Sequence, residues 1–335
     1  MSILINAFKI IFLLGFLILI HEGGHFLAAK FFKVKVEKFS IGFGPRIFSK
    51  QGKETTYSIS LIPFGGYVQM TGEMERSDEK GAFNNAKILH RIAIVASGPI
   101  INILFGIIVY FILILTSGVY ASTIIEEIIP EALPNISNLQ AGDKIIQIND
   151  EKIRIKSDID KALAENKGEE ISIIALRDGK EISAKVTPTE YTDGVYILGI
   201  KLERLEANFN DRIYIAFWKT ADFTGSIGSS MVMLFTGKVS VNQMAGPIGI
   251  SSIVAESKGI YNFIYLLCLI SISLGITNLL PIPALDGGRL LLLIIEAIRG
   301  KALDEDLELK IQSIGFTLLI LLSLYVSYND ILRLF

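Results

Sequence analysis

Four apolar runs, each about long enough to cross a lipid bilayer, constrain the fold of this 335-residue chain more than any other feature. A helix of roughly 20 apolar residues spans the hydrocarbon core, and it satisfies its own backbone polar groups internally. The runs extend from about Ile3 to Ala29, from Ile92 past Val119, from Gly259 to Leu285, and from about Ile311 to Tyr328. We therefore predict a polytopic α-helical membrane protein with four transmembrane helices.

The composition agrees with a membrane protein that also carries polar segments. Hydrophobic residues make up 51% of the chain and the mean hydropathy is +0.50, while the 20% of charged residues lie between the apolar runs. A net charge of -2 gives no reason to expect nucleic acid as a partner. The single cysteine, Cys268, excludes an intrachain disulfide and a zinc site made of cysteines, and we interpret it as a small packing residue.

The first apolar run contains the motif HEGGH at residues 21–25, which places ionisable side chains within the bilayer. A charged residue at the centre of a span costs about 2.5–3.5 kcal/mol on insertion scales, so such a group of residues requires a functional reason. Residues four apart point the same way on a helix, so His21 and His25 can share one Zn²⁺. Glu22 lies about 100° round the helix from His21, beside the metal, where it can take a proton from an attacking water molecule. The alternative is a pair of bundle-facing histidines partnered by a glutamate.

Basic residues between the runs predict the orientation in the membrane. They are Lys30, Lys33, Lys35, Lys38, Arg46, Lys50, Lys53, Lys87 and Arg91 in the first loop, and Arg289, Arg299, Lys301 and Lys310 in the third. By the positive-inside rule both loops are cytoplasmic, which places the two termini and the segment 120–258 outside. HEGGH and the end of the third run then share the cytoplasmic half of the bilayer. The short run 290–295 is predicted to be a membrane-surface or re-entrant helix.

The segment NLLPIPALDGG, residues 278–288, supplies a candidate third ligand. Pro281 and Pro283 break the helix, Asp286 follows at the predicted depth of the histidines, and two glycines allow the backbone to turn tightly. A catalytic zinc site needs three protein ligands and a water molecule. His90 is the one remaining histidine, and its basic neighbours favour an interfacial role. Asp286 is therefore the best third ligand, although it could also cap the helix that follows.

Three motifs together resemble the site-two protease family of intramembrane zinc metalloproteases. They are HEGGH in the first run, SGPIIN at residues 97–102 in the second, and NLLPIPALDGG after the third. The likeness covers nearly the whole chain and is to the bacterial regulator-of-sigma-E protease branch, which has an inserted PDZ domain. The resemblance implies zinc ligation by His21, His25 and Asp286, a general base at Glu22, and a polar group near the substrate backbone at Asn278. For Asn278, the alternative to this role is an interhelical hydrogen bond.

Residues 120–205 alternate short β-branched runs with turn residues, as an inserted α+β domain would. Residues 141–150 predict a glycine turn, a strand and a second turn, residues 157–166 a short helix, and residues 171–186 a hairpin with an Asp-Gly turn. The pattern resembles a single PDZ domain of the bacterial protease type, which binds extended peptide ends by strand addition. We predict that it is extracytoplasmic. The alternative is a spacer or steric gate that binds no peptide.

A membrane-associated β-meander is predicted at about residues 34–70, and the family likeness places it near the active site on the cytoplasmic side. We interpret Gly42, Gly44, Gly65 and Gly66 as substrate-binding residues, because glycines in strands permit close backbone approach. A sheet edge there could hold a substrate that has been unwound into a strand. Plain structural packing is the alternative.

Two further segments complete the chain. Residues 206–258 are predicted to form an amphipathic interfacial segment, because apolar and charged residues alternate at helical spacing between 208 and 236. Residues 73–80 carry both signs of charge and are predicted to be a solvated loop without a chemical role.

These inferences predict an intramembrane zinc metalloendopeptidase of the bacterial inner membrane, with its active site toward the cytoplasm. Residues 1–119 and 259–335 would supply the four spans, and Zn²⁺ is the predicted cofactor. The family likeness implies single-pass membrane proteins as substrates, either anti-sigma factors or remnant signal peptides. The alternatives are a non-proteolytic membrane receptor built around the PDZ-like domain and a zinc hydrolase that acts on a lipid or small molecule.

Overall fold

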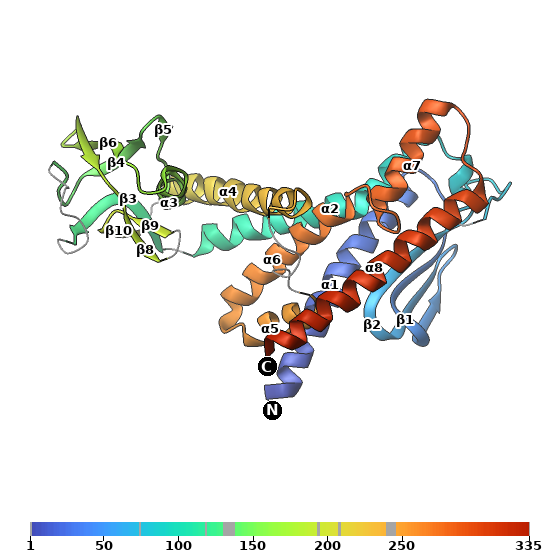
Figure 1. Cartoon of the computed structure of the whole chain (residues 1–335). Coiled ribbons are helices and arrows are strands. Elements are labelled where there is room, and N and C mark those ends of the chain that lie inside the picture. Colours follow the sequence, from blue (N-terminus) through green and yellow to red (C-terminus); the bar gives the residue numbers. More distant parts are fainter. Residues whose placement is uncertain are drawn as a thin grey trace. The chain divides into compact units, whose positions relative to one another are not determined.

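The computed structural model describes residues 2–73, 75–117, 119–129, 138–192, 195–206, 209–238 and 246–334, which form two compact units (Figure 1). The helical unit comprises residues 1–110 and 226–335, and the inserted unit comprises residues 111–225. The helices and strands are α1 (Ser2–Phe31), β1 (Val36–Gln51), β2 (Thr56–Met70), a 3₁₀ turn (Phe83–Asn85), α2 (Ile88–Thr116), β3 (Val119–Ile128), β4 (Lys144–Ile148), β5 (Glu151–Lys152), α3 (Lys156–Asn166), β6 (Ile171–Arg177), β7 (Lys180–Val186), β8 (Thr189–Thr192), β9 (Val195–Ile197), β10 (Ile200–Glu206), α4 (Phe209–Phe235), α5 (Pro247–Glu256), α6 (Gly259–Asn278), α7 (Asp286–Arg299) and α8 (Glu305–Leu334).

The four predicted spans are confirmed as helices that are long and apolar enough to cross a membrane. Within the described residues they are Leu4–Phe31, Ile88–Thr116, Gly259–Asn278 and Glu305–Arg333. The predicted ends of the second and third spans are wrong. Helix α2 ends at Thr116, so Val119 already belongs to β3, and α6 ends at Asn278 rather than at Leu285. Neither Pro281 nor Pro283 has the backbone N–H that a continuing helix would use.

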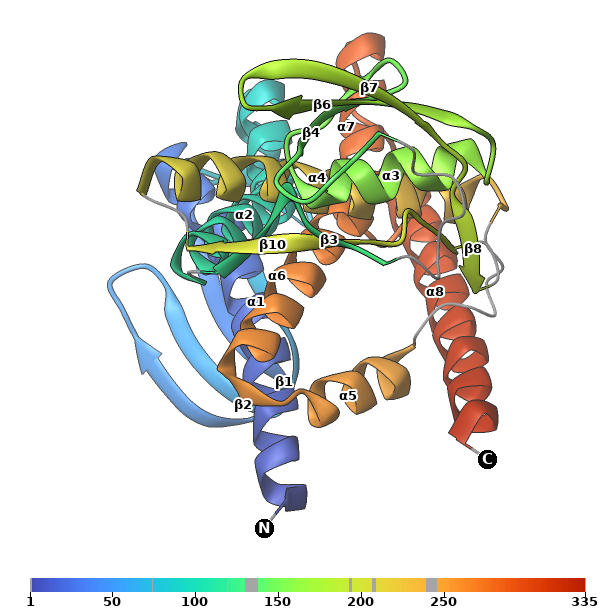
Figure 2. The ribbon, with the colours of Figure 1, turned by 90° about the vertical axis from the view of Figure 1, so that its left-hand side faces the viewer.

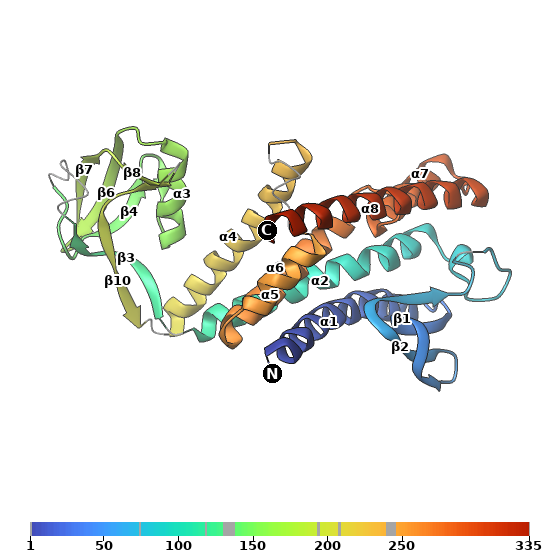
Figure 3. The same ribbon diagram turned by 60° about the horizontal axis from the view of Figure 1, so that its bottom comes forward.

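Where the sequence predicted a β-meander, the structure has a strongly bent sheet made of two long antiparallel strands, β1 and β2. Both halves of β2 flank the first half of β1, since Ser40 is paired with Tyr67 and also with Ser58. The sheet lies beside α1 (Figure 3) and shares a core with residues of three helices, α1, α2 and α7. The buried residues of this core are Ala29, Val34, Val36, Met70, Phe83, Ile94, Val95 and Leu293.

Helices α2 and α6 pack closely through small residues. A Cβ atom at Gly275 of α6 would lie 2.6 Å from the carbonyl oxygen of Pro99 in α2. The Ser271 hydroxyl donates a hydrogen bond of 2.8 Å to the carbonyl oxygen of Asn102. Small residues and hydroxyl hydrogen bonds are the features that hold helices together in lipid, where apolar burial gives little driving force. Cys268 is fully buried in α6, as expected for a packing residue.

The inserted unit is built around a sheet in the order β10-β3-β4-β6-β7, with β5 paired to β4. Helix α3 packs on this sheet (Figure 2), and Ile159, Ala162 and Leu163 of α3 belong to the same buried core as the central strands. The predicted turn, short helix and hairpin are all present. Asp178 and Gly179 both adopt a positive φ between β6 and β7, as an Asp-Gly hairpin turn requires.

A buried ion pair closes one end of this sheet. Asp143 is fully buried, and its carboxylate accepts hydrogen bonds from Nε of Arg177 at 2.7 Å and Nη2 of Arg177 at 2.8 Å. The backbone N–H of Gln140 donates a third hydrogen bond of 2.8 Å. The Arg177 guanidinium holds the pKa of the Asp143 carboxyl below its usual range. The ionised form of Asp143 is therefore the one that stabilises the folded unit.

Replacing Asp143 by asparagine should destabilise the inserted unit by about 2 kcal/mol at neutral pH, because charge-assisted hydrogen bonds to a buried group are lost. The folded-state pKa lies below the unfolded-state value of about 3.9, so the stabilisation is present above that value and is lost as the pH falls through the folded-state pKa. The difference between wild type and variant should shrink in the same range. Urea unfolding of the full chain in detergent, followed by proteolysis, measures both effects. The exposed Asp150 changed to asparagine is the control, and an equal loss there would contradict the assignment.

Candidate metal centre

Three side chains from two distant parts of the helical unit turn their ligand atoms toward one point. Nε2 of His21 lies 3.3 Å from Nε2 of His25, one helical turn further along α1. Oδ2 of Asp286 lies 3.1 Å from the first of these nitrogens and 3.5 Å from the second. They form the one group of metal-ligand side chains found among the described residues. The structure therefore brings together the three residues that the sequence predicted as ligands.

The geometry fits a zinc ion. Ligand atoms that are about 2.0–2.1 Å from a tetrahedral zinc ion lie about 3.3–3.4 Å from one another, and the three observed separations scatter around this value. Oδ2 of Asp286 is buried and accepts no hydrogen bond within the described residues. Two imidazole nitrogens and a carboxylate oxygen are ordinary zinc ligands, and they leave a fourth position for water or substrate.

Helix α2 fixes the orientation of His25. Nδ1 of His25 donates a hydrogen bond of 2.9 Å to the carbonyl oxygen of Ile94, which leaves the Nε2 lone pair free for a metal. This contact requires α1 and α2 to approach very closely. A Cβ atom at Gly24 would lie 2.6 Å from the carbonyl oxygen of Ser97, and a Cβ atom at Gly98 would overlap the His25 ring. Glycine at both positions therefore allows the histidine to occupy its place.

Asn102 of α2 plays the corresponding part for His21, and the sequence did not assign it that role. It is fully buried, its amide lies 3.3 Å from Nδ1 of His21, and its Oδ1 has no hydrogen-bond partner among the described residues. The two ends of the Asn102 amide group have nearly the same shape, so the group also fits when it is turned over. In that orientation Oδ1 of Asn102 accepts a hydrogen bond from the Nδ1–H of His21. A polar amide within a long apolar run was the available signal, since such groups usually mark function.

Asp286 reaches the histidines on a separate short helix. It is the first residue of α7, and the N-cap position is taken by Leu285, so the suggested capping role of Asp286 is not observed. Neither Gly287 nor Gly288 has a positive φ, so the expected tight turn is not the reason for these glycines. They instead leave space for the segment that precedes the helix. Cβ atoms on them would overlap the carbonyl oxygens of Leu280 and Ile282.

Glu22 and the three candidate ligands line a small cavity of about 160 Å³. Gly66 of β2 also lines it, and a Cβ atom there would lie 3.2 Å from Cγ of Glu22. The cavity is lined by His21, Glu22, His25, Gly66, Tyr67, Val68, Met70, Glu73, Val95, Asp286 and Arg289.

The other predicted substrate-binding residues lie outside this lining. Gly42 and Gly44 adopt positive φ values where β1 bends, and a Cβ atom at Gly65 would overlap the ring of Phe43. Asn278 is the last residue of α6. His90, the rejected ligand, stacks on Phe32 with ring centroids 4.4 Å apart.

Glu73 overturns the expectation of a solvated loop at its position. Its side chain is only 10% exposed and forms an ion pair with Arg289 of α7. Its other carboxylate oxygen accepts a hydrogen bond of 2.9 Å from the backbone N–H of Met70. The end of β2 is thereby tied to the helix that carries Asp286. Charge patterning alone could not reveal this pairing, because the two residues are far apart in the sequence.

Comparisons with known proteins agree over nearly the whole chain. The model of peptidase family M50 matches residues 9–322. A Clostridium acetobutylicum protein named as a candidate zinc metalloprotease is 35% identical, with 95% of this chain and 94% of the relative covered. The regulator of sigma-W protease RasP of Bacillus subtilis is 31% identical, with 98% of each covered. Among solved structures, the PDZ domain of an SdrC-like protein from Listeria monocytogenes is 22% identical and covers 25% of this chain and 86% of that domain. Its TM-score of 0.20 is too low to assign a fold.

Alanine at Gly24 or at Gly98 should weaken zinc retention by about tenfold or more, because the added methyl group displaces His25 from the other ligands. Gly23→Ala is the matched control inside the same motif. A Cβ atom at Gly23 meets nothing within 4 Å among the described residues, so this variant should keep its zinc. The metal content of purified protein after dialysis against graded chelator gives the comparison. Equal zinc loss at Gly23 would show that helix contact is not the cause.

Removal of the Asn102 amide should weaken zinc binding about 10- to 100-fold, as loss of a partner to a ligating histidine does. Asn102→Leu tests this, and Asn102→Asp keeps an oxygen that can accept the His21 Nδ1–H. Zinc affinity from chelator competition should therefore fall in the leucine variant and be largely retained in the aspartate variant. A similar loss in both would mean that Asn102 only fills space.

Proposed function

The chain belongs to peptidase family M50 and is an intramembrane zinc metalloprotease, and we propose that His21, His25 and Asp286 hold its zinc ion while Glu22 is its general base. The observation that carries this assignment is the convergence of three ligand atoms at separations of 3.1–3.5 Å beside Glu22. Two of the three ligands lie on an apolar helix that is long enough to span the bilayer.

Bound zinc supplies a Lewis acid that polarises the scissile carbonyl and makes water a stronger nucleophile near neutral pH. Glu22 takes the proton from the attacking water and then gives it to the leaving amine. The Ile94 carbonyl and the Asn102 amide keep the two imidazoles turned toward the metal position.

The proposed substrates are the transmembrane segments of single-pass membrane proteins. The Bacillus subtilis relative is named as a regulator of sigma-W, and this name supports membrane-anchored anti-sigma factors as one substrate class. Remnant signal peptides are a second. We place the enzyme in the bacterial inner membrane with the active site toward the cytoplasm, on the strength of the basic first and third loops.

The bent sheet is proposed to hold the substrate in an extended form. Gly66 contributes bare backbone to the cavity wall next to Glu22, which suits close approach of a substrate strand. Gly65 directly precedes Gly66, and Gly42 and Gly44 lie where β1 bends. Asn278 is the last residue of α6, before the segment that leads to Asp286. Extension matters because a peptide bond in an intact helix is hydrogen-bonded and shielded from attack.

The inserted unit is proposed to be an extracytoplasmic PDZ-like domain, and residues 206–258 an interfacial segment. Strands β4, β6 and β7 with α3 agree with the predicted elements of such a domain. It would bind an extended peptide end by strand addition, or act as a steric gate that admits only shortened substrates.

Glu22→Gln should retain zinc and lose proteolysis by about 10²- to 10⁴-fold, because it keeps the shape of the side chain and removes the base. Cleavage of a reconstituted transmembrane peptide, with the metal content measured on the same preparation, tests the assignment. Glu256→Gln on α5 is the matched control, since Glu256 is exposed and lies outside the cavity lining. Undiminished cleavage by Glu22→Gln would rule out the proposed mechanism.

A further inference from the structure

A second, larger cavity adjoins the catalytic one. It measures about 530 Å³, and Glu73, Asp286 and Arg289 line both cavities. The catalytic cavity measures only about 160 Å³. Ligand sites usually measure about 300–1,000 Å³, so the substrate residues that flank the scissile bond need neighbouring space. The larger cavity has a suitable size and shares a wall with the metal site.

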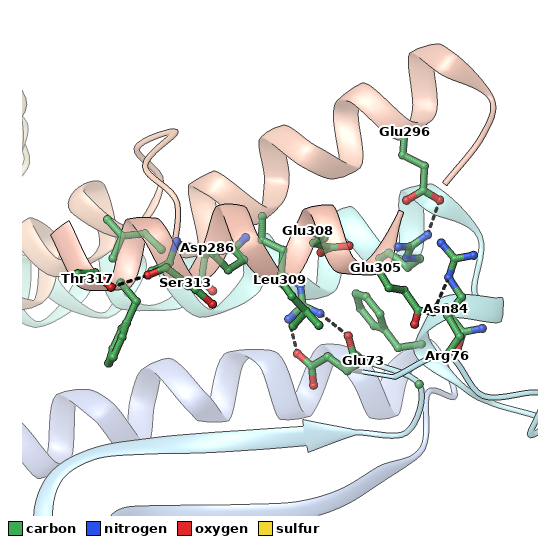
Figure 4. Close-up of a pocket in the computed structure, with 18 residues that line it drawn as sticks. Glu73, Arg76, Asn84, Asp286, Glu296, Glu305, Glu308, Leu309, Ser313 and Thr317 are labelled. Atoms are coloured by element: carbon green, nitrogen blue, oxygen red, sulfur yellow. Dashed lines mark hydrogen bonds and ion pairs between the residues drawn. The ribbon is translucent and has the colours of Figure 1, made fainter. Parts of the chain in front are cut away.

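The larger cavity follows one face of α8 (Figure 4). Its lining on this helix runs from Glu305 to Thr317, about 18 Å at the rise of an α-helix. An extended peptide covers about 3.3 Å per residue, so about five residues fit along it. Charged residues line the end near Glu305, whereas Leu309, Phe316 and small polar residues line the remainder. A segment that is apolar at one end and polar at the other matches this lining.

The lining of this cavity carries more carboxylates than arginines. All three of its arginines already have carboxylate partners: Arg76 pairs with Glu305 at 3.0 Å, Arg91 with Glu296 at 2.7 Å, and Arg289 with Glu73. The guanidinium groups of Arg91 and Arg289 also lie over the ring of Phe83, which restrains them further.

Two carboxylates of the lining remain outside these ion pairs. Asp286 is assigned to the metal, and Glu308 has no ion-pair partner among the described residues. The uncompensated charge of this cavity is therefore negative and is located at Glu308. A cationic side chain of a ligand would compensate it.

We propose that this cavity binds the polar flank of the substrate next to the scissile bond, and that Glu308 selects a lysine or arginine there. The inference rests on the proposed proteolytic function. It agrees with the proposed orientation, because the cytoplasmic flanks of membrane segments are rich in lysine and arginine. An acidic first turn also stabilises α8 through the helix dipole, but that effect is independent of the substrate sequence. Substrate preference therefore separates the two roles.

The test uses the full chain reconstituted in liposomes and three transmembrane peptides that carry Lys, Ala or Glu at the flanking positions. Wild type should cleave the Lys peptide about fivefold or more faster than the Glu peptide, as opposite and like charges near a binding site dictate. Glu308→Gln should reduce this ratio toward one, and Glu308→Lys should invert it. Glu181→Gln, an exposed change in the inserted unit, should keep the wild-type ratio.

Affinities of the same peptides for the Glu22→Gln background supply a second readout that does not need cleavage. A Lys-to-Glu preference in binding that disappears with Glu308→Gln supports the cavity assignment even where cleavage fails. Equal ratios in wild type and both Glu308 variants, with cleavage intact, would overturn this proposal and leave the proteolytic function standing. Absence of cleavage in wild type, with the binding preference present, would contradict the proposed function alone.

Discussion

The close contact between α1 and α2 at Gly24 and Gly98 is the constraint on which the proposed metal centre depends. Lipid gives two apolar helices little reason to associate, so packing and buried hydrogen bonds must hold them together. The bare backbone at these glycines lets α2 present a carbonyl oxygen to His25 and an amide to His21. Helix α6 adds a second close contact on α2 through Gly275. The orientation of both histidines therefore depends on contacts with α2.

The third ligand is held in a different way. Asp286 lies on a short helix outside the spans, and its place depends on polar contacts and on close backbone packing of the segment before it. Gln312 of α8 accepts a hydrogen bond of 2.5 Å from the backbone N–H of Ala284, and Arg289 is ion-paired with Glu73. Two of the candidate ligands are thus fixed by helix packing and the third by a polar network. The centre joins α1, α2, α7, α8 and the end of β2 in a single arrangement.

Local periodicity explains which features the sequence could predict. The spacing of His21 and His25, the presence of four apolar helices and the Asp-Gly hairpin all depend on local sequence, and the structure agrees with these predictions apart from the ends of the second and third spans. Asp286 could be inferred because few other ligands exist at a matching depth. The contribution of Asn102 depends on the rotation of α2 about its axis, which no local pattern fixes. The burial of Glu73 similarly depends on a partner more than 200 residues away.

The roles of Gly287 and Gly288 also could not be predicted from local sequence. Sequence reasoning assigned them a conformational role, whereas the structure assigns them a spatial one, since the atoms that exclude a side chain belong to the preceding turn. A glycine has both properties, and the residue type alone does not distinguish them. The distinction requires the position of the neighbouring backbone.

The pairing of β3 with β10 has a consequence for how this architecture can vary. These are the first and last strands of the inserted unit's sheet, and Val119 lies opposite Glu206, so the chain leaves the sheet next to the point where it enters. Adjacent strands are only about 4.8 Å apart. A module whose two ends meet can be lengthened, duplicated or exchanged without changing the separation of the points to which it is attached. The helical unit and the inserted unit can therefore evolve at independent rates within one chain.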